Sequence, residues 1–368
     1  MQIKSKIYWY LFPFAVLYWI IIYIRNILFD LNILSSKEYQ VPVISVGNIT
    51  VGGTGKTPFI EYLANLLYKD FSVAVLSRGY KRTSRGFILA GLSSSSKEIG
   101  DEPKQIKQKF PDVNVAVDTN RVRGIDKLLN KITGLDVLLL DDAYQHRYVK
   151  PGISIVLVDY NHLITKDYIL PVGRLREPAR ETRRANIIIV TKCPKDLKPI
   201  ERRILQKEIN PFPYQNLYFT KITYQIIKPV FNHIEIDSND LTDKLKNQKP
   251  VILIITGIAN PRLFKKYARG ISSKIKELHF PDHHFFEKSD LDKILEEFRK
   301  ISNNKIILTT EKDATRFRDI NDIPGELKDN MYYVPISIEF LFNQQDEFNK
   351  QIFDYVSKNA KYRKMATV

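Results

Sequence analysis

Cysteine is almost absent from this chain of 368 residues, which holds only Cys193. A single cysteine excludes a disulfide framework and any zinc site built from cysteines, and it is typical of a reducing compartment. Acidic residues are also scarce, since 41 Asp and Glu stand against 57 Lys and Arg and leave a formal net charge of +16. This basic excess predicts an anionic partner, such as nucleic acid, a phosphorylated substrate or a membrane surface, without choosing among them.

An uncharged apolar run, Ile7–Ile24, reaches the lower length limit of a membrane-spanning helix. Its tryptophans, Trp9 and Trp19, favour the headgroup boundary, and no small-residue cleavage site of a signal peptide follows. We expect residues 1–35 to form a membrane-associated hydrophobic helix, either spanning or interfacial, with the catalytic body on the cytoplasmic face. A buried core helix is the alternative. At 44% hydrophobic and 27% charged, the chain as a whole is neither disordered nor a polytopic membrane protein.

Short β-branched runs alternate with amphipathic stretches from residue 41 onward, which is the pattern of a parallel sheet covered by helices. The strands expected in a first unit are 41–46, 72–77, 113–118, 136–141, 153–159 and 186–191. A second unit follows, with expected strands at 251–256, 275–280, 305–310 and 331–336. We therefore predict an α/β fold with a larger domain at 36–217, an extended β linker at 218–238 and a smaller α/β domain at 239–368.

A glycine-rich turn, GNITVGGTGKTP, follows the first expected strand and precedes a helical pattern. This is the context that a P-loop requires, although Thr50 replaces the first glycine of the motif. Backbone N–H groups of such a loop wrap phosphate oxygens, the lysine reaches the β- and γ-phosphates, and the next hydroxyl holds Mg²⁺. The residues expected to bind ATP are Gly52, Gly53, Thr54, Gly55, Lys56 and Thr57.

Two adjacent carboxylates, Asp141 and Asp142, end an apolar strand at the edge of the sheet where ligands of α/β proteins lie. Together with Thr57 they predict the Mg²⁺ site of the P-loop. The strand at 186–191 is followed, three residues on, by Pro194, at a position where GTPases of this architecture place an aspartate that binds guanine. Proline cannot accept that hydrogen bond, so ATP is favoured.

Four further blocks carry polar residues that the P-loop does not explain. GDEP at 100–103 is typical of a helix start, so Asp101 alone is more simply a helix cap than a catalyst. LPVGRLREP at 170–178 packs two arginines and a glutamate between prolines, which suits anion clamping. Residues 279–284 end in FPDHH and hold three of the six histidines, but they lack a spaced third metal ligand. TEKDA at 310–314 ends another apolar strand.

Taken in order, these blocks resemble the tetraacyldisaccharide 4′-kinase family, the lipid A 4′-kinases of Gram-negative bacteria. The matching blocks run from residue 43 to 314 and are GGTGKTP, SRGY, GDEP, DDxxQH, LPxGxLREP, TGIANP, FPDHH and TEKDA. One departure is Ala143-Tyr144, where the family usually has Gly-Phe or Gly-Leu. The resemblance implies transfer of the ATP γ-phosphoryl group to the 4′-hydroxyl of a tetraacylated glucosamine disaccharide 1-phosphate. It also implies two α/β/α domains joined by a β-ribbon, and an N-terminal helix associated with the inner membrane.

The resemblance also assigns residue roles. By motif matching, Asp101 is the base that acts on the sugar hydroxyl, assisted by His283 or its neighbour His284, and Lys56 completes the catalytic set. The residues expected to bind substrate or support the site are Arg78, Arg121, His146, Arg176 and Glu177. The expected partners are the lipid substrate and the inner-membrane surface, with no nucleic acid, because the aromatic residues do not lie among the basic ones. A membrane-associated P-loop regulator is the alternative class of protein.

Overall fold

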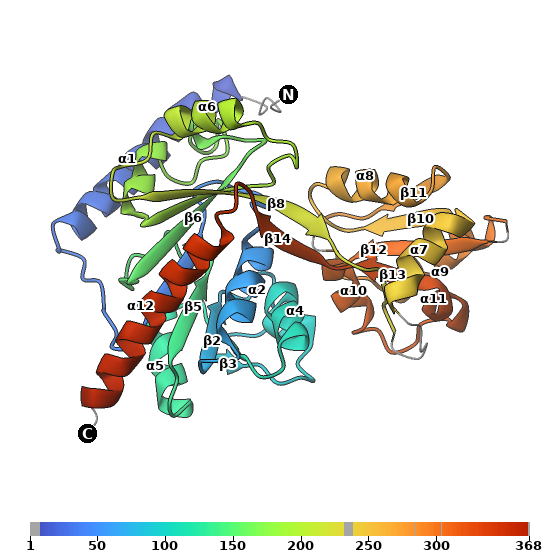
Figure 1. Ribbon diagram of the computed structural model, residues 1–368, viewed down its shortest axis with the longest axis horizontal. Helices are drawn as coiled ribbons and strands as arrows, with labels where there is room; N and C mark the ends of the chain where they lie inside the picture. Colours follow the sequence, from blue (N-terminus) through green and yellow to red (C-terminus); the bar gives the residue numbers. More distant parts are fainter. Residues whose placement is uncertain (1–7, 232–237, 283, 303, 367–368) are drawn as a thin grey trace.

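Two α/β units make up the part of the chain described in the computed structural model (Figure 1). The described residues are 8–231, 238–282, 284–302 and 304–366. Within them, the larger unit holds a nine-stranded sheet and the smaller unit a five-stranded sheet. Strands β8 (Asn216–Tyr224) and β14 (Ile336–Phe340) pair antiparallel and run between the units as a ribbon (Figure 1). The predicted fold class, a parallel-sheet domain and a smaller α/β domain joined by a β-ribbon, is confirmed.

The strand order of each sheet is as follows. The larger sheet runs β14, β8, β7 (Ile187–Thr191), β6 (Ile153–Asp159), β1 (Val43–Gly47), β5 (Val137–Asp141), β2 (Val73–Ser77), β4 (Asn114–Val117) and β3 (Ile88–Leu89). Its neighbours pair in parallel except at the two edges, where β3 and β14 are antiparallel. The smaller sheet runs β11 (Ile275–His279), β10 (Val251–Thr256), β12 (Lys305–Thr310), β13 (Met331–Val334) and β9 (Lys228–Pro229).

Helices cover both sheets. Those of the larger unit are α1 (Phe12–Asp30), α2 (Lys56–Leu67), α3 (Ser96–Ile99), α4 (Asp101–Lys109), α5 (Arg121–Lys131), α6 (Pro199–Ile209) and α12 (Gln345–Ala366). Those of the smaller unit are α7 (Ser238–Gln248), α8 (Arg262–Ile271), α9 (Lys288–Arg299), α10 (Glu311–Phe317) and α11 (Gly325–Asn330).

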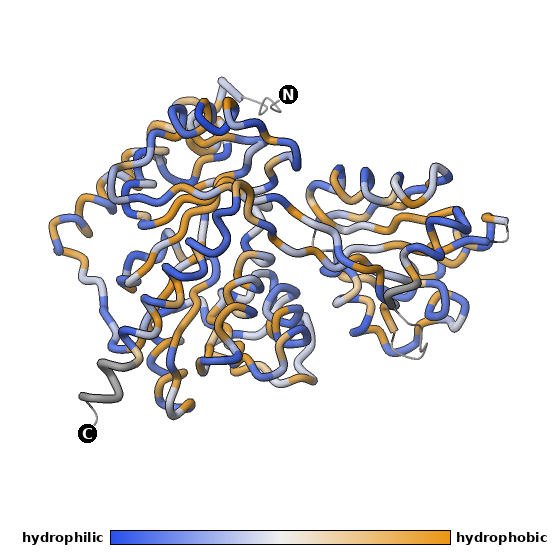
Figure 2. The backbone as a smooth tube through the Cα atoms, viewed as in Figure 1, coloured by the Kyte–Doolittle hydropathy of each residue, from blue (hydrophilic) through white to orange (hydrophobic). Residues whose placement is uncertain are grey.

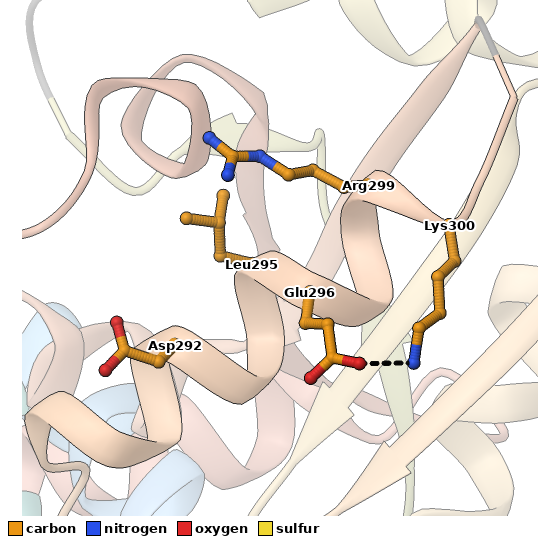
Figure 3. A pocket seen from close by; sticks show the side chains of 5 residues that line it. All are labelled: Asp292, Leu295, Glu296, Arg299 and Lys300. Carbon is orange, nitrogen blue, oxygen red and sulfur yellow. Dashed lines mark ion pairs between the residues drawn. The ribbon is translucent and has the colours of Figure 1, made fainter.

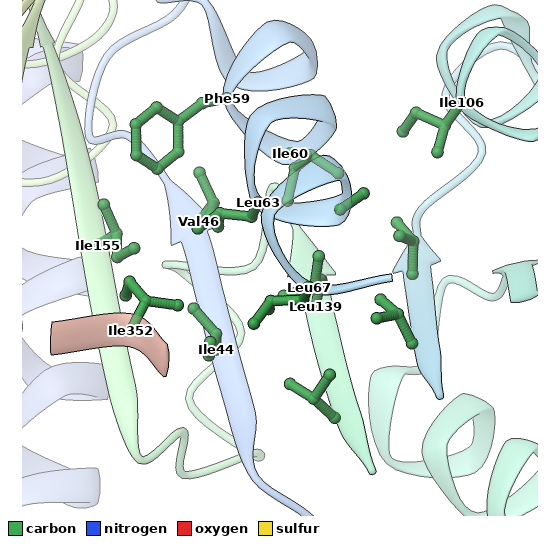
Figure 4. Close-up of a cluster of buried hydrophobic side chains, with 14 of the residues drawn as sticks. Ile44, Val46, Phe59, Ile60, Leu63, Leu67, Ile106, Leu139, Ile155 and Ile352 are labelled. Carbon is green, nitrogen blue, oxygen red and sulfur yellow. The ribbon is translucent and has the colours of Figure 1, made fainter. Parts of the chain in front are cut away.

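The main core of the larger unit lies between its central strands and helix α2. Every residue of β1, β2, β5, β6 and β7 is buried, which explains why these strands have near-continuous apolar sequences. Figure 4 shows Ile44 and Val46 of β1 and Leu139 of β5 facing Leu63 of α2. In Figure 2 the strands are largely hydrophobic and the outer helices alternate, as expected for a sheet covered by amphipathic helices.

The C-terminal helix departs from the predicted domain division. Residues 239–368 were expected to form the smaller domain, but α12 packs on the larger unit, and Phe348 and Ile352 belong to the core beside β1 (Figures 1 and 4). The expected strand at 331–336 is also divided, because Pro335 separates β13 from β14. Proline lacks the N–H that a sheet ladder needs, and the chain changes sheets there. The smaller unit is therefore an insertion between β8 and β14.

Helix α1 lies on the surface of the larger unit. Residues 9–30 form a helical segment long and apolar enough to cross a membrane, and only 11% of its most hydrophobic window is buried. Its buried residues are Ala15, Asn26 and Phe29. The alternative of a buried core helix is wrong, because most of the apolar side chains of α1 face outward.

Candidate active site

The P-loop lies at the carboxyl ends of the central parallel strands. It follows β1 and leads into α2, and the β1–β5 register places Val46 opposite Asp141. Gly52 and Gly55 have φ values of +106° and +90°, which side-chain-bearing residues rarely adopt. The glycines thus allow the loop to turn tightly, and the N-terminus of α2 points its N–H groups at the position where a phosphate would lie.

Lys56 and the acidic turn meet at this edge of the sheet. Lys56 Nζ lies 3.3 Å from Asp142 Oδ1 and 3.3 Å from Asn48 Oδ1. Arg176 Nη1 is 3.4 Å from the same Asp142 carboxylate. Burial alone would raise the pKa of Asp142, but Lys56 and Arg176 together hold it below its ordinary value. Asp142 is therefore an anion held between two cations.

Asp141 has a different environment from its neighbour. Its side chain is almost fully buried, and Oδ2 accepts a hydrogen bond of 2.9 Å from Ser77 Oγ at the end of β2. Burial, followed by the charges of Glu102 and Asp142, raises the pKa of Asp141 to about 7. Asp141 Oδ1 is buried without a hydrogen-bond partner among the described residues. A cation would satisfy this oxygen, so the site fits Mg²⁺.

The ligands offered to such a cation are the Asp141 and Asp142 carboxylates and the Thr57 hydroxyl. All are oxygen donors, which Mg²⁺ prefers, and Mg²⁺ usually takes its remaining ligands from water and nucleotide phosphates. Across the described ranges, no group of three or more His, Cys, Asp or Glu could hold a metal by itself. That result agrees with the few protein ligands of a P-loop metal site.

The LPVGRLREP block braces the P-loop from one side. Val51 N donates to Arg174 O at 2.8 Å, Arg174 Nη2 donates to Val51 O at 2.9 Å, and Arg176 N donates to Ile49 O at 2.7 Å. The two segments thus pair like short antiparallel strands, with a bridge between Thr50 and Leu175. The block fixes the shape of the loop as well as bringing Arg176 to Asp142.

A second brace comes from the end of β7. Lys192 Nζ donates to Gly53 O and lies 2.6 Å from Asp159 Oδ2, and Thr191 Oγ1 donates to Thr54 O at 2.8 Å. In the sequence, this segment distinguishes only adenine from guanine. Two residues that support the site, Asn48 and Lys192, were therefore not predicted, although the Thr-Lys pair at a strand end beside a P-loop was the available signal.

Three of the residues expected to bind substrate or support the site are held by other residues around it. Arg121 is buried, and its Nη2 donates to Asp141 O at 2.9 Å, so it holds the backbone of the acidic turn. Glu177 is fully buried between Arg184 and Arg25. Arg176 contacts Asp142, as described above. Arg121 and Glu177 therefore support the site from inside the protein, whereas Arg176 is partly exposed.

The two remaining residues of that set are His146 and Arg78. Burial, and then the charges of Arg121, Arg25 and Arg78, lower the pKa of His146 to about 4, so its ring is neutral near pH 7. Arg78 follows β2 with an exposed side chain. It is thus a cation at the rim of the site, in a position open to an anionic ligand.

Asp101 is the first residue of α4 and points toward the smaller unit. The N-cap of that helix is Gly100, and no side chain caps the helix there. The Asp101 carboxylate instead accepts a hydrogen bond from Arg316 Nη2 at 2.6 Å. The simpler interpretation of Asp101 as a helix cap is therefore wrong. His283 lies outside the described residues. His284 Nε2 lies 2.7 Å from Asp290 Oδ2, so its ring is tied to the start of α9.

Two surface hollows lie away from this site. One, of about 510 Å³, is lined by residues of and next to α9 (Figure 3), where Glu296 and Lys300 form an ion pair of 2.7 Å. The other lies between the segment before β1 and helix α5. Neither is lined by a residue of the P-loop or of the acidic turn.

The whole chain resembles proteins of known function. Residues 7–357 match the sequence profile of the family described as tetraacyldisaccharide-1-P 4′-kinase. The chain belongs to this family. The tetraacyldisaccharide 4′-kinase of Bacteroides thetaiotaomicron is 48% identical over 365 residues, covering 97% of this chain and 95% of the relative. That of Flavobacterium johnsoniae is 44% identical over 349 residues, covering 95% and 97%.

A solved structure of a tetraacyldisaccharide 4′-kinase family member has the same fold. The crystal structure of the "apo" form of LpxK from Aquifex aeolicus in complex with ATP matches with a TM-score of 0.72 and 30% identity. The match covers 94% of this chain and 98% of that one. The resemblance drawn from the ordered sequence blocks is thereby confirmed, and the P-loop of this tetraacyldisaccharide 4′-kinase family member belongs to a kinase fold that binds ATP.

Proposed function

We propose that this protein transfers the γ-phosphoryl group of ATP to the 4′-hydroxyl of a tetraacylated glucosamine disaccharide 1-phosphate, a step in the synthesis of lipid A. The observation that carries the proposal is the meeting of Lys56, Asp142 and Arg176 at the P-loop, in a chain of the tetraacyldisaccharide 4′-kinase family. A lysine and an arginine within 3.4 Å of one carboxylate make a cationic site in which phosphoryl charge is stabilised.

The nucleotide is bound by the P-loop residues. Backbone N–H groups of residues 52–57 hold the phosphates, and Lys56 reaches toward the transferred group. Mg²⁺, held by Thr57, Asp141 and Asp142, would supply further neutralisation of phosphate charge. Arg121, Ser77 and Asn48 keep the acidic turn and Lys56 in place.

The acceptor is activated by Asp101. An alcohol is a poor nucleophile, and a positioned base contributes roughly 10²–10⁴-fold to such a reaction. Asp101 takes the hydroxyl proton while the sugar oxygen attacks, and His283 assists it. Support comes from the two residues before His283, because Lys81 Nζ donates to Asp282 O at 3.2 Å and a Cβ on Gly257, which accepts from Arg316 Nη1, would lie 3.2 Å from Pro281 O.

The lipid acceptor is taken from the cytoplasmic face of the inner membrane. The exposed apolar side of α1 inserts among the acyl chains, and the basic excess of the chain favours an anionic surface. Arg78, at the rim of the site, contributes to binding the anionic headgroup. The catalytic body remains in the cytosol, where ATP is available.

The test is a phosphoryl-transfer assay in detergent micelles, with labelled ATP, Mg²⁺ and the tetraacyl disaccharide 1-phosphate. The wild type is compared with Asp101→Ala and Lys56→Ala. Wild-type transfer that falls by roughly 10²-fold or more in both variants is the expected result. ATP binding measured by calorimetry should be lost only in Lys56→Ala, because Lys56 belongs to the P-loop whereas Asp101 accepts its hydrogen bonds from Arg316 of the smaller unit.

Two results contradict the proposal. Wild-type protein that binds ATP but phosphorylates no lipid would instead point to a P-loop regulator that hydrolyses ATP slowly. Full activity of Asp101→Ala would leave the kinase function standing but remove Asp101 as the base.

A further inference from the structure

Two sequence blocks to which no role has been given, TGIANP and TEKDA, build one buried socket in the smaller unit. Asp313 Oδ2 accepts from Gly257 N at 3.0 Å and from Thr310 Oγ1 at 2.7 Å. Asp313 Oδ1 accepts from Arg316 Nη1 at 2.7 Å, and the same nitrogen donates to Gly257 O at 3.2 Å. A Cβ on Gly257 would lie 3.1 Å from Asp313 Oδ1, so glycine lets the loop close on this pair.

The socket holds Arg316 so that its guanidinium group contacts the larger unit. Arg316 Nε and Nη2 donate to Asp101 Oδ2 at 3.0 Å and 2.6 Å. Both side chains are buried, Arg316 at 2% and Asp101 at 5% exposure. Two charge-assisted bonds from a planar guanidinium fix the orientation of the carboxylate more firmly than a single donor could.

This contact differs from the other ties between α4 and the smaller unit. Glu102 pairs with Lys312 at 3.1 Å, Lys109 with Glu311 at 3.2 Å, and Lys104 with Asp319, and at least one side chain of each pair is partly exposed. They hold the two units together without Arg316. A buried ion pair adds little net stability, so the socket around Arg316 is better explained by the catalytic base that it grips.

We propose that Arg316 is a positioning residue for the phosphoryl transfer. Its two hydrogen bonds to Oδ2 of Asp101 fix the orientation of the carboxylate toward the acceptor, so the base is complete only where the two units meet. The hydroxyl proton passes to Asp101 as the sugar oxygen bonds to the γ-phosphorus and the bond to ADP breaks. The inference rests on the proposed function and on Asp101 as its base.

The test uses the full chain with Arg316→Lys, Arg316→Gln and Asp101→Ala, alone and combined. Arg316→Gln should lower kcat by about 10-fold or more while KM for ATP stays unchanged, because the hydrogen bonds of Arg316 in the described residues go to Asp101, Gly257 and Asp313 and not to the P-loop. Arg316→Lys should recover part of the loss. The double variant Asp101→Ala/Arg316→Gln should be no slower than Asp101→Ala, because the arginine acts through the aspartate.

Two further variants control for folding. Arg316→Gln/Asp313→Asn removes the buried cation together with one of the two carboxylates that it pairs, so it leaves one buried anion fewer than Arg316→Gln and should still show the fall in kcat if the single variant is unstable. Asp319→Asn breaks the ties of Asp319 to Lys104 and Ser96 across the same interface without touching Asp101, and it should keep near wild-type kcat.

Three results would overturn the inference. They are wild-type kcat in a folded Arg316→Gln, a double variant much slower than Asp101→Ala, and a loss in Asp319→Asn as large as that in Arg316→Gln. The last two would make Arg316 part of the interface only. If the wild-type protein phosphorylates no lipid, the first measurement shows it before any variant is compared. That result would overturn the proposed function and this inference together.

Discussion

At Asp141 the chain puts a carboxyl group where water does not reach it. Its ordinary pKa of 3.8 is raised to about 7, by burial first and then by Glu102 and Asp142. At a pH between these two pKa values, Asp141 is protonated in the folded protein and ionised in the unfolded chain. The stability contributed by this group is therefore present below the ordinary pKa and is lost as the pH rises through about 7.

Asp141→Asn should consequently stabilise the protein in the absence of metal, on the order of 1–3 kcal/mol at about pH 8 and less at about pH 5. The measurement is urea unfolding at both pH values in EDTA. Ser77→Ala removes the hydrogen-bond donor to the same carboxyl but leaves its charge buried, so it serves as the control that should not stabilise. An equal gain from Asp141→Asn at both pH values would show that the carboxyl is already ionised at the lower one.

Residues of the site differ in how far the sequence predicts them. The P-loop glycines and Lys56 are predictable because the motif is local and its chemistry depends on neighbours in the chain. Arg316 is not, since its partner Asp101 is 215 residues away and only the docking of α10 on α4 joins them. Lys192 is of the same kind, because its contact with Gly53 depends on which strands are adjacent.

At the scale of elements, α1 has two faces with different roles. On its outer face Phe14, Leu17, Ile21 and Ile24 are each more than half exposed, at spacings of three and four residues. On its inner face Tyr18 OH donates to the backbone carbonyl of residue 176 at 3.0 Å. The helix is thus joined to the loop that contacts Asp142, as well as facing outward.

Arg25 makes the second inner contact, because its Nη2 donates to Gln145 O at 2.5 Å while Nη1 lies 3.9 Å from Glu177. We expect Arg25→Gln to lower kcat with detergent-dispersed lipid by roughly 3- to 10-fold, since it leaves buried Glu177 with one cation fewer. Vesicle co-sedimentation should not change.

The matched outer-face variant, Leu17→Gln/Ile21→Gln, should change vesicle binding but not kcat in detergent. Loss of two exposed apolar side chains that would insert among the acyl chains should weaken binding to anionic vesicles by about 10-fold or more, while activity in detergent stays near the wild type. The same sedimentation and transfer assays measure both. Equal behaviour of the inner and outer variants in the two assays would refute the division of α1 into two faces.

The six strands expected in the first unit match β1, β2, β4, β5, β6 and β7 to within two residues, because a parallel strand buried on both faces needs an apolar run, as in β6. The edge strands β3, β8 and β14 were not predicted as members of this sheet. The role of the last helix was not predictable in this way. Its apolar positions indicate a helix with one buried side, but not which of two sheets covers that side. The ribbon pairing of β14 with β8 decides this, and that pairing spans more than a hundred residues.

At the scale of the whole molecule, α12 closes the core of the larger unit. Phe348 has no exposed surface and packs against the rings of Phe59, Tyr218 and Phe340. Phe348→Ala should cost about 3–5 kcal/mol of unfolding free energy, the usual range for a buried aromatic ring. Phe353→Ala, on the same helix but about one-third exposed, should cost clearly less.

Urea denaturation followed by nucleotide binding reports the larger unit directly, because the P-loop lies there. If α12 belonged to the smaller unit, Phe348→Ala would leave the nucleotide-binding transition at its wild-type midpoint. A shift of that transition is the expected result.

The insertion of the smaller unit between β8 and β14 has a consequence for biosynthesis. A ribosome releases the P-loop strands first, then the whole of the smaller unit, and only afterwards β14 and α12. The smaller unit is continuous in the chain, so all of its strands have emerged before β14 does. The nucleotide-binding sheet must wait for the final segment to cover Phe59 and β1. A nascent chain stalled before residue 336 would thus expose an unfinished apolar sheet, which chaperones would have to shield until translation ends.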